Sequence, residues 1–469
     1  MTNNSERLIK KTGIYFIGNL SSKILSTVLV PIYAFYISTN DLGYFDFSQT
    51  IMGIISPIIM LAIWEAILKY LIVENNEEEQ NKIVSTSAIF SFFSIFVLLV
   101  LAVIYKLFFG NSIMHLGHIL FMISIQTVVI VWQYYARSFK HTKEYVLAGI
   151  FSTVVNFLFV IILVVTFKLG LLGLLLAYNF GQIVAFLILE RKMHILKRLK
   201  LNEFKIKTLK KMIKYSSPLV LNLVSLWGIT GFSRMIVTLK LGADFNGLYS
   251  FASKFSSILA MLGSVLTMAI IEESILLINN KDFSSQFEKT INKTLHIFFA
   301  LAIMVIPVLT IFYNTIQGTD YFTSRDLTPW LLMYAIFTIL STSVGSIFQA
   351  LDKTRQLFYT TLLGCGLSVL LITLLINAMG LRGVVIAQTL GAFIMLLARC
   401  VLANKLIDLK VHWFQMLGLI CFFVITTIIC FMNGIAISIV MFSIILGLFI
   451  FLNRRQAVRM YTMLKKTFK

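Results

Sequence analysis

This sequence has little charge for its length, and that scarcity excludes a water-soluble fold. Only 13% of its 469 residues are charged, whereas 58% are hydrophobic. A soluble protein would carry about twice that charged fraction. No polar segment is long enough to form a soluble domain, and apolar stretches recur along the whole chain. Because a spanning helix needs roughly 20 mostly apolar residues, the sequence predicts an all-α polytopic membrane protein.

The sequence also lacks the patterns of a secretory leader, a disulfide framework and a metal site. Its first apolar stretch is too long for a signal peptide and is followed by no small-residue cleavage site. The four cysteines lie in apolar stretches without CxxC spacing, as small apolar side chains do. His115 and His118 share a helical face but belong to no ligand cluster, so we expect them to be structural. We therefore expect neither metal nor cofactor.

Hydropathy predicts about fourteen transmembrane helices. The predicted spans are 12–38, 41–66, 84–109, 113–138, 146–167, 170–190, 214–240, 244–271, 291–316, 326–350, 357–379, 382–405, 411–432 and 434–453. Several are joined by only a few residues, which is typical of helical hairpins.

Lysine and arginine outnumber acidic residues by 40 to 20, and their distribution is uneven. If the N-terminus is cytoplasmic, 32 of the 40 fall in cytoplasmic segments, and ten of these lie in residues 191–214. Five fall in segments on the outer side of the membrane, and three lie within spans. The positive-inside rule then places both termini in the cytoplasm. The net charge of +20 is thereby explained without nucleic acid, and we expect residues 191–214 to face anionic lipid headgroups.

The two halves of the chain carry related patterns. An offset of 204 residues aligns ISTNDLGYFDFSQT (37–50) with LGADFNGLYSFASK (241–254), so that Gly43 matches Gly247. Small residues at such positions allow close helix packing in lipid, which is the role we expect for these glycines.

A second match later in each half extends the repeat. GLLGLLLAYNFG (170–181) aligns with GLRGVVIAQTLG (380–391), and both read G-x-x-G-x-x-x-A-x-x-x-G. Each half therefore holds six spans, and an even number makes the repeats parallel. The sequence predicts two pseudo-symmetric six-helix bundles around a central cavity, with an appended C-terminal helix pair.

These repeats predict three regions. Residues 1–200 form an N-terminal six-helix bundle that ends in the basic cytoplasmic linker. Residues 201–408 form the second bundle, and residues 409–469 form the appended pair with a basic cytoplasmic tail.

Three basic residues are singled out deep in predicted spans, where an ionisable side chain is costly and marks a functional candidate. Lys23 is near the middle of span one, and at helical rise Arg234 and Lys254 lie roughly 9 and 15 Å from the outer ends of spans seven and eight. These spans are repeat counterparts, so we expect the charges to line the cavity. Lys and Arg donate charge-assisted hydrogen bonds to phosphate, which indicates a pyrophosphate-bearing substrate. The alternative is that each cation snorkels or pairs with backbone carbonyls.

Acidic side chains are scarce in the same spans. Asp46 is near the outer end of span two, while Glu65 and Glu272 lie near inner ends and are candidates for a cytoplasmic gate. Glu65 precedes Lys69 by four residues, which predicts an ordinary i,i+4 pair. Since no acid lies centrally in spans one or seven, the sequence predicts a positive cavity.

Polar residues on these helices are candidates for contacts with sugar hydroxyls or with neighbouring helices. They are Asn19, Gln49, Asn222 and Ser233.

Two segments carry a resemblance to a known family. GNLSSKILSTVLVPIYAFYISTNDLGYFDFSQTI (18–51) and SSPLVLNLVSLWGITGFSRMIVTLKLGADFNGLYSFASKF (216–255) resemble polysaccharide repeat-unit flippases of the multidrug/oligosaccharidyl-lipid/polysaccharide exporter superfamily. The resemblance implies fourteen helices in two bundles, with Lys23, Arg234 and Lys254 matching cavity-lining basic residues. It departs at Ser233, where many relatives carry an acid, so ion coupling through that acid is not implied.

The resemblance and the charge pattern together predict a flippase, not an enzyme. Its substrate would be an undecaprenyl-pyrophosphate-linked oligosaccharide, moved from the inner to the outer leaflet of the bacterial cytoplasmic membrane by alternating access. Expected partners are this lipid-linked oligosaccharide, membrane lipids, a polysaccharide polymerase and glycosyltransferases. Coupling to protons or sodium ions stays open.

Three other functions are alternatives to this flippase. Another lipid-linked envelope precursor, of the lipid II or teichoic-acid type, has similar chemistry. A multidrug antiporter for cations needs buried carboxylates, which the central spans lack. A membrane-embedded polymerase or ligase needs an outer catalytic loop, whereas the outer loops are short, the longest being around 315–326.

Overall fold

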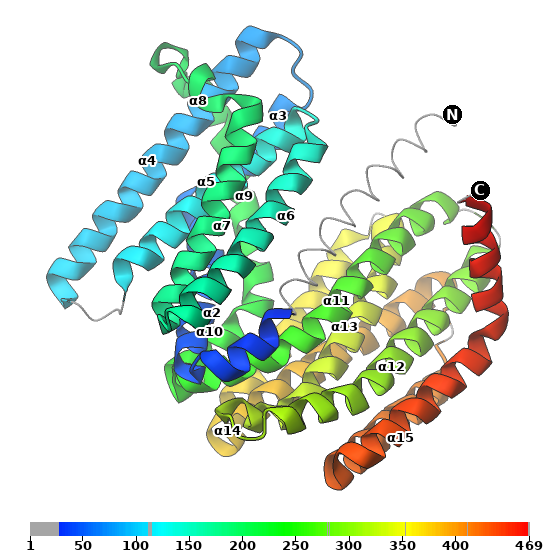
Figure 1. Ribbon diagram of the computed structural model, residues 1–469. Helices are drawn as coiled ribbons and strands as arrows, with labels where there is room; N and C mark the ends of the chain where they lie inside the picture. Colours follow the sequence, from blue (N-terminus) through cyan, green and yellow to red (C-terminus); the bar gives the residue numbers. More distant parts are fainter. Residues whose placement is uncertain are drawn as a thin grey trace. The chain divides into compact units, whose positions relative to one another are not determined.

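The computed structural model describes residues 28–110, 115–278, 280, 282–351, 353–409 and 411–467. These residues are almost entirely helical and include no strand. The chain divides into two compact units, Met1–Ser250 (unit 1) and Phe251–Lys469 (unit 2). Figure 1 shows the helices of each unit.

Unit 1 contains the helices from α2 to α10. Its elements are α2 (Thr39–Ile59), α3 (Ile63–Leu71), α4 (Glu77–Phe109), α5 (Leu116–Ser138), α6 (Thr142–Val160), the π-helical η1 (Ile161–Thr166), α7 (Gly170–Met193), α8 (Ile195–Arg198), the 3₁₀ turn η2 (Leu201–Glu203), α9 (Ile206–Thr230) and α10 (Phe232–Leu241). The first turns of α11 (Ala243–Leu277) also belong to it.

Unit 2 contains the rest of α11 and the longest helices. Its further elements are α12 (Phe283–Thr315), the 3₁₀ segment η3 (Asp320–Leu327), α13 (Thr328–Ala350), α14 (Thr354–Ile407) and α15 (Trp413–Thr467). The compact units divide at Ser250, whereas the sequence predicts a boundary between the repeats at residue 200. Helices α9 and α10 belong to the second predicted repeat but pack within unit 1.

The predicted membrane architecture is confirmed. Nine helices in the described part of the chain are long and apolar enough to cross a membrane, or ten if α2 and α3 form one span bent by 58°. Predicted spans two to fourteen each fall on a described helix or helix pair. Most of the first, 12–38, lies outside the described residues.

Helix α14 contains a reversal of direction. Gly380 has non-helical angles of φ 57° and ψ −135°. A Cβ on Gly391 would approach the carbonyl oxygen of Gly364 to 2.8 Å, although a straight helix would separate these residues by roughly 40 Å. The segment is therefore an antiparallel hairpin of two spans. Helix α15 breaks in the same way at Gly434, where φ is 73°.

Unit 1 repeats this hairpin design at its own glycine motif. Gly170 opens α7 with φ 54°, close to the value at its repeat counterpart Gly380. A Cβ on Gly181 would approach the carbonyl oxygen of Ser152 in α6 to 2.6 Å. The glycines of the motif therefore let the two helices of the hairpin touch, as predicted, and Gly170 also turns the chain, which was not predicted.

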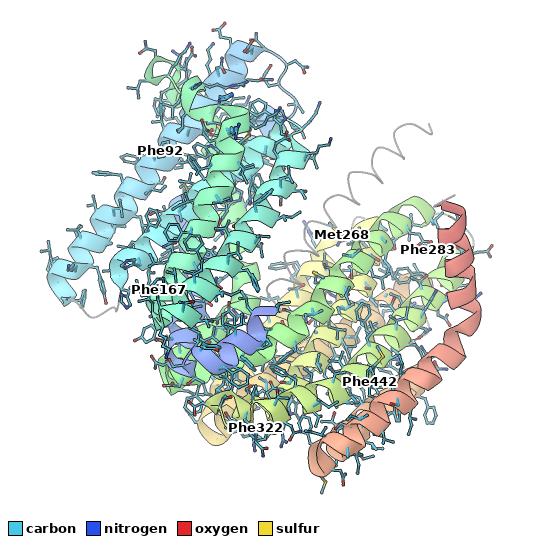
Figure 2. All side chains as sticks on the ribbon, viewed as in Figure 1. Phe92, Phe167, Met268, Phe283, Phe322 and Phe442 are labelled. Carbon is cyan, nitrogen blue, oxygen red and sulfur yellow. The ribbon has the colours of Figure 1, made fainter. Side chains whose placement is uncertain are left out.

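Large apolar side chains face outward in both units, as expected for helices surrounded by lipid. Phe92 and Phe167 of unit 1 and Met268 of unit 2 are exposed (Figure 2). Inside unit 1, Trp132 and Tyr135 are fully buried, and their polar atoms bond to Glu190 and Ser87, at 2.8 and 2.7 Å. The polar atoms of these two large core side chains are thus satisfied within unit 1.

Candidate functional site

One face of α2 is lined by small and polar residues. Gly43, Asp46, Thr50 and Gly53 recur every three or four positions, so they lie in one stripe along the helix. This stripe faces α9, α10 and the start of α11 within unit 1.

The stripe begins at a close crossing of two repeat-related helices. A Cβ on Gly43 would overlap the carbonyl oxygen of Ala243, and a Cβ on Gly247 would overlap that of Thr39. Residues 39 and 243, like 43 and 247, are 204 positions apart, so the two contacts are reciprocal. Such reciprocity is the mark of a two-fold relation, and here it relates the start of α2 to the start of α11.

Polar contacts follow the same two-fold relation. Asn40 donates from Nδ2 to Oδ2 of its repeat counterpart Asp244 at 3.1 Å, and Thr39 donates from Oγ1 to Oδ1 of Asp244 at 2.8 Å. One turn further along, Ser250 donates from Oγ to Oδ1 of its counterpart Asp46 at 2.9 Å.

Asp46 is the anionic centre of this cluster. Its Oδ1 accepts a hydrogen bond from Arg234 Nη1 at 2.6 Å, across 188 residues of sequence. Its Oδ2 accepts from Asn246 Nδ2 at 3.3 Å, and the same amide donates to the carbonyl oxygen of Gly43 at 2.9 Å. With Ser250, three donors surround the carboxylate, so its oxygens are satisfied within unit 1.

The pair is unequally buried, which matters for function. Only 7% of the Asp46 side chain is exposed, whereas 29% of the Arg234 side chain is. The guanidinium also lies 5.8 Å from the ring centre of buried Tyr249. The cation is therefore the less buried partner, while the anion is enclosed.

Trp227 holds α2 against α9 below the pair. Its Nε1 donates to the carbonyl oxygen of Thr50 at 2.7 Å. A Cβ at Gly53 would approach the indole to 3.2 Å, and one at Gly231 would overlap the same ring. The stripe of small residues on α2 thus makes room for this indole.

Arg234 is the predicted cation that the structure places in a polar cluster, but the sequence missed its partner. Asp46 was recorded only as an acid near a helix end, and the cavity was expected to be positive. Asp46 forms an ion pair with Arg234 that the sequence analysis did not predict, and the positive cavity stays a prediction.

The other predicted site residues are distributed as follows. Ser233 is buried and Gln49 is half-buried in unit 1, and Lys254 is half-buried on α11 in unit 2. Lys23 and Asn19 lie outside the described residues, and the side chains of Asn222 and Glu272 are likewise not described. The roles of all these residues stay predictions.

The expected pair of Glu65 and Lys69 does not form, so that prediction was wrong. Glu65 Oε1 accepts a hydrogen bond from Tyr134 of α5 at 2.7 Å. Lys69 instead lies over the ring of Tyr215, 3.8 Å from its centre. Tyr134 and Tyr215 lie on neighbouring helices that pack against α3, and their rings take the place of the expected Glu65–Lys69 pair.

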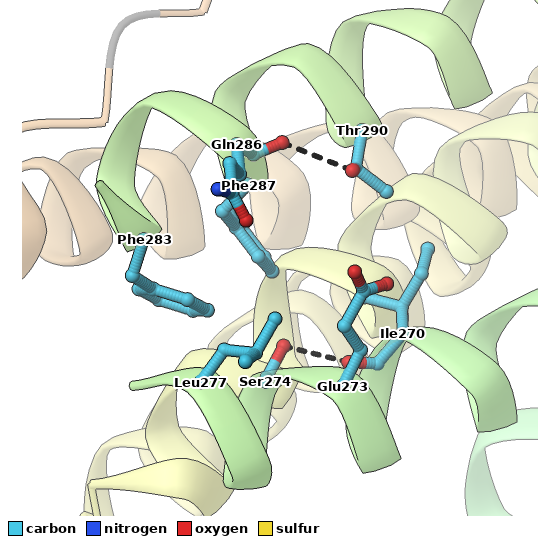
Figure 3. Close-up of a pocket in the computed structure, with 8 residues that line it drawn as sticks. All are labelled: Ile270, Glu273, Ser274, Leu277, Phe283, Gln286, Phe287 and Thr290. Carbon is cyan, nitrogen blue, oxygen red and sulfur yellow. Dashed lines mark hydrogen bonds between the residues drawn. The ribbon is translucent and has the colours of Figure 1, made fainter. Parts of the chain in front are cut away.

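A small pocket lies next to the proposed gate residue of unit 2. Residues of α11 and α12, including Glu273, Ser274 and Gln286, line it (Figure 3). Its volume is about 10 Å³, room for about one water molecule. Ser274 Oγ lies 3.1 Å from Ser346 Oγ on α13, within hydrogen-bonding distance. The pocket is too small for a headgroup.

Unit 1 has a larger cavity between α5 and α7. It measures about 240 Å³ and is lined mostly by apolar side chains, among them Phe121 and Phe180, with His118 and the buried Asn179. This lining does not suit a charged headgroup, and it includes no residue of the Asp46 cluster.

Arg399 is a buried cation that the sequence analysis did not single out, although it lies within the predicted span 382–405. It is only 3% exposed. It donates to Ser341 O and Thr361 Oγ1, each at 2.8 Å, and to Thr360 Oγ1 at 3.2 Å. It therefore joins α13 to both arms of the α14 hairpin and is positioned for structure within unit 2.

No group of three or more His, Cys, Asp or Glu side chains that could hold a metal ion occurs in the described ranges. His115 and His118 face each other as rings 5.8 Å apart.

Known proteins resemble this chain in sequence and in fold. A family model described as "Polysaccharide biosynthesis protein" matches residues 8–271. An uncharacterized membrane protein of Methanocaldococcus jannaschii is 23% identical over 395 residues, or 80% of this chain and 92% of that protein.

Two solved structures illustrate the fold. The lipid II flippase MurJ in an inward closed conformation matches with a TM-score of 0.72, covering 95% of this chain and 100% of that chain at 15% identity. An inward-facing multidrug resistance MATE family transporter of the MOP superfamily matches with a TM-score of 0.59, covering 83% and 94% at 16% identity.

The family match spans more than half of the chain, and the two structural matches establish the fold. The predicted family and fold class are thus confirmed. The chain belongs to the polysaccharide biosynthesis protein family and is a multi-pass membrane protein with the fold shared by these transporters.

Proposed function

We propose that this protein is a flippase for an undecaprenyl-pyrophosphate-linked oligosaccharide, which it moves from the inner to the outer leaflet by alternating access. The membership in a polysaccharide biosynthesis family and the transporter fold support the general activity. The arrangement around Arg234 supports the anionic substrate.

The carrying observation is the unequal burial of the Asp46–Arg234 pair. Arg234 presents a guanidinium that is 29% exposed while Asp46 is enclosed by three donors. A pyrophosphate offers the same fork-shaped acceptor as a carboxylate and carries more charge. It can therefore compete with Asp46 for Arg234 and return the guanidinium to Asp46 when it leaves.

This exchange keeps the Arg234 guanidinium paired both before the substrate binds and after it leaves, so the free-energy cost of an unpaired cation is avoided. A guanidinium left bare in a membrane interior would be strongly destabilised. Asp46 satisfies it when no substrate is bound, and the headgroup satisfies it during transport. The proposal assigns Lys23 and Lys254 the same phosphate-binding chemistry from their sequence positions. Asn19, Gln49, Asn222 and Ser233 are assigned to the sugar, and Glu65 and Glu272 to a cytoplasmic gate.

The proposed orientation has both termini in the cytoplasm of a bacterial cell, as the excess of basic residues in the inner segments indicates. The proposed partners are the polymerase and glycosyltransferases that use and make the substrate.

The experiment measures binding and flipping of an undecaprenyl-pyrophosphate oligosaccharide by purified protein in vesicles. We expect Arg234→Gln to lose binding and Asp46→Asn, which frees Arg234 from its competitor, to bind as tightly as the wild type or tighter. The double variant should behave like Arg234→Gln, because the phosphate ligand itself is missing. Arg355→Gln, at an exposed position of α14, is the control.

Two results would contradict the proposal. If Arg234→Gln binds the lipid with wild-type affinity, Arg234 is not a ligand. If the double variant recovers full flipping that both single variants lose, the pair serves only as a structural latch. Lipid II as a competitor distinguishes the precursor alternative, since both lipids share the pyrophosphate and differ in their sugars.

A further inference from the structure

The connection between α7 and α9 is a defined surface, which we call the basic platform (residues 194–214). It contains the short helix α8, the turn η2 and the first two turns of α9. In Figure 1, α8 lies near the start of α4 at one end of unit 1.

Two buried hydroxyls of α4 hold the platform in place. Ser85 Oγ donates to the carbonyl oxygen of Arg198 at 3.3 Å and lies 3.2 Å from the backbone nitrogen of Lys200, which donates to it. Thr86 Oγ1 accepts from the backbone nitrogen of Lys205 at 3.2 Å. Both hydroxyl residues are fully buried. The lysines of the platform therefore project from a fixed backbone.

A carboxylate secures the entry to the platform. Glu190 accepts hydrogen bonds from the backbone nitrogens of Ile195 and Leu196, at 3.1 and 2.9 Å. It also accepts from Trp132 Nε1 at 2.8 Å. Glu190 is thus occupied by structural donors. Glu203 lies within the platform itself, and among the described residues it forms no ion pair with the platform lysines.

Seven exposed lysines make the platform strongly positive. They are Lys197, Lys200, Lys205, Lys207, Lys210, Lys211 and Lys214. Within the part of the chain that the structure describes, none of them forms an ion pair with a carboxylate. Lys211 has an aromatic contact with Tyr70, at 4.7 Å from the ring centre. The charge is therefore available to an external anion.

Large apolar side chains are exposed among these lysines. Leu196 is 46% exposed, Leu201 76% and Ile206 55%. In water this pattern would leave apolar surface uncovered, and a soluble polyanion would not cover it. At a membrane interface, the apolar side chains can enter the acyl boundary while the ammonium groups stay at the phosphates.

We infer that the basic platform binds the headgroups of anionic phospholipids in the leaflet beside it, with Leu196, Leu201 and Ile206 inserted below them. The basic charge supplies the electrostatic attraction, the apolar side chains supply the burial, and the anchors on α4 fix both at one level. The inference uses the proposed orientation of the chain but not the proposed substrate.

The test measures which lipids contact the full-length protein in symmetric vesicles of phosphatidylcholine. Spin-labelled phosphatidylglycerol and phosphatidylcholine are compared as probes, and the ratio of their association constants is the readout. We expect the wild type to prefer phosphatidylglycerol by at least about twofold at low salt, and the preference to shrink at high salt because exposed charges are screened. Symmetric vesicles make the result independent of which face is cytoplasmic.

Matched variants separate the platform from positive charge in general. Lys200, Lys205, Lys207 and Lys210 replaced together by Gln should bring the ratio close to one, whereas the same four replaced by Arg should keep it. The control replaces four exposed lysines elsewhere, Lys143, Lys289, Lys293 and Lys405, by Gln. It should keep the wild-type ratio.

A second variant tests the apolar part with all lysines retained. Leu201→Ser together with Ile206→Ser should lower the phosphatidylglycerol preference, because the platform would sit further from the headgroups. A monodisperse elution and a melting temperature like those of the wild type would show that this variant is folded. The Lys→Gln variant changes only solvated side chains, so it tests the platform even if the Ser variant does not fold.

Three results would overturn the inference. One is a phosphatidylglycerol preference that survives the four Lys→Gln changes. Another is an equal loss in the control variant, which would assign the preference to overall charge. The third is platform-dependent binding of inorganic polyphosphate in detergent without any lipid preference, which would identify a site for soluble polyanions. Flipping activity enters none of these readouts, so failure here leaves the proposed transport untouched.

Discussion

Gly43 and Gly247 occupy equivalent positions in the two sequence repeats, and they also lie at the crossing of the helices that carry them. A Cβ on either residue would overlap a backbone carbonyl oxygen of the other helix, that of Ala243 or of Thr39. Backbone atoms cannot move aside as a flexible side chain can. The crossing therefore depends on the absence of both Cβ atoms, and it brings Asp46 within reach of Ser250.

The first prediction concerns this crossing. We expect Gly43→Ala and Gly247→Ala each to lower the free energy of unfolding by about 1–3 kcal/mol through overpacking. Gly149→Ala in α6 is the control, since a Cβ there has no neighbour within 4 Å. Its effect should be neutral or slightly stabilising, by up to about 1 kcal/mol, because alanine favours helix. Thermal unfolding of purified protein measures the difference. If the variants at the crossing lost no more stability than Gly149→Ala, the close crossing would be refuted.

The second prediction concerns the strength of the Asp46–Arg234 pair. A double-mutant cycle with Asp46→Asn and Arg234→Gln should give a coupling free energy of about 1–3 kcal/mol, because Asp46 is enclosed while Arg234 is partly solvated. The exposed pair Arg382–Asp326, with an N–O distance of 2.7 Å, is the matched control. Its coupling should stay below about 1 kcal/mol. A coupling for Asp46 and Arg234 no larger than the control would show that the pair contributes little.

The third prediction concerns Arg399. Its planar fork reaches acceptors on three helical segments, and a lysine ammonium cannot match that geometry. We expect Arg399→Lys to cost about 1–3 kcal/mol of stability by leaving buried acceptors unpaired. Arg355→Lys, exposed on the same hairpin, should have almost no effect. Denaturation midpoints check this, and a wild-type midpoint for Arg399→Lys would exclude the proposed joining role.

The fourth prediction concerns the turn of the α14 hairpin. Gly380 has φ 57° and ψ −135°, a region that residues with a Cβ avoid. Gly380→Ala should therefore cost about 1–3 kcal/mol. Gly366→Ala lies in the same hairpin, where a Cβ would have no neighbour within 4 Å, and should be tolerated. The melting temperatures of the two variants provide the comparison, and equal values would argue against a strained turn.

Much of the fold was predictable because a bilayer imposes simple rules on sequence. Each crossing must be apolar and long enough to satisfy its own backbone, so predicted spans from the second onward match described helices. The glycine motif was informative for a similar reason. Gly170 and Gly380 share a positive φ because both turn the chain between antiparallel helices.

The candidate site was only half predictable. Arg234 was identified because a cation in a predicted span is rare and costly. Its partner was not, since Asp46 is 188 positions away and no spacing rule links them. Glu65 shows the same limit, because local spacing favoured Lys69 and the structure pairs it with Tyr134. Arg399 was not singled out because its acceptors, Thr360 Oγ1 and the carbonyl oxygen of Ser341, lie on helical segments far from it in sequence.

The sequence alone determined that this chain crosses the membrane many times, that its halves repeat, and that its basic residues gather in the segments proposed to be cytoplasmic. Those properties follow from hydropathy, spacing and composition, which act locally along the chain. Only the tertiary structure decided which charges meet. Helix packing brings Asp46, Arg234 and Ser250 together, and electrostatic neutralisation depends on distances in space that residue order does not encode.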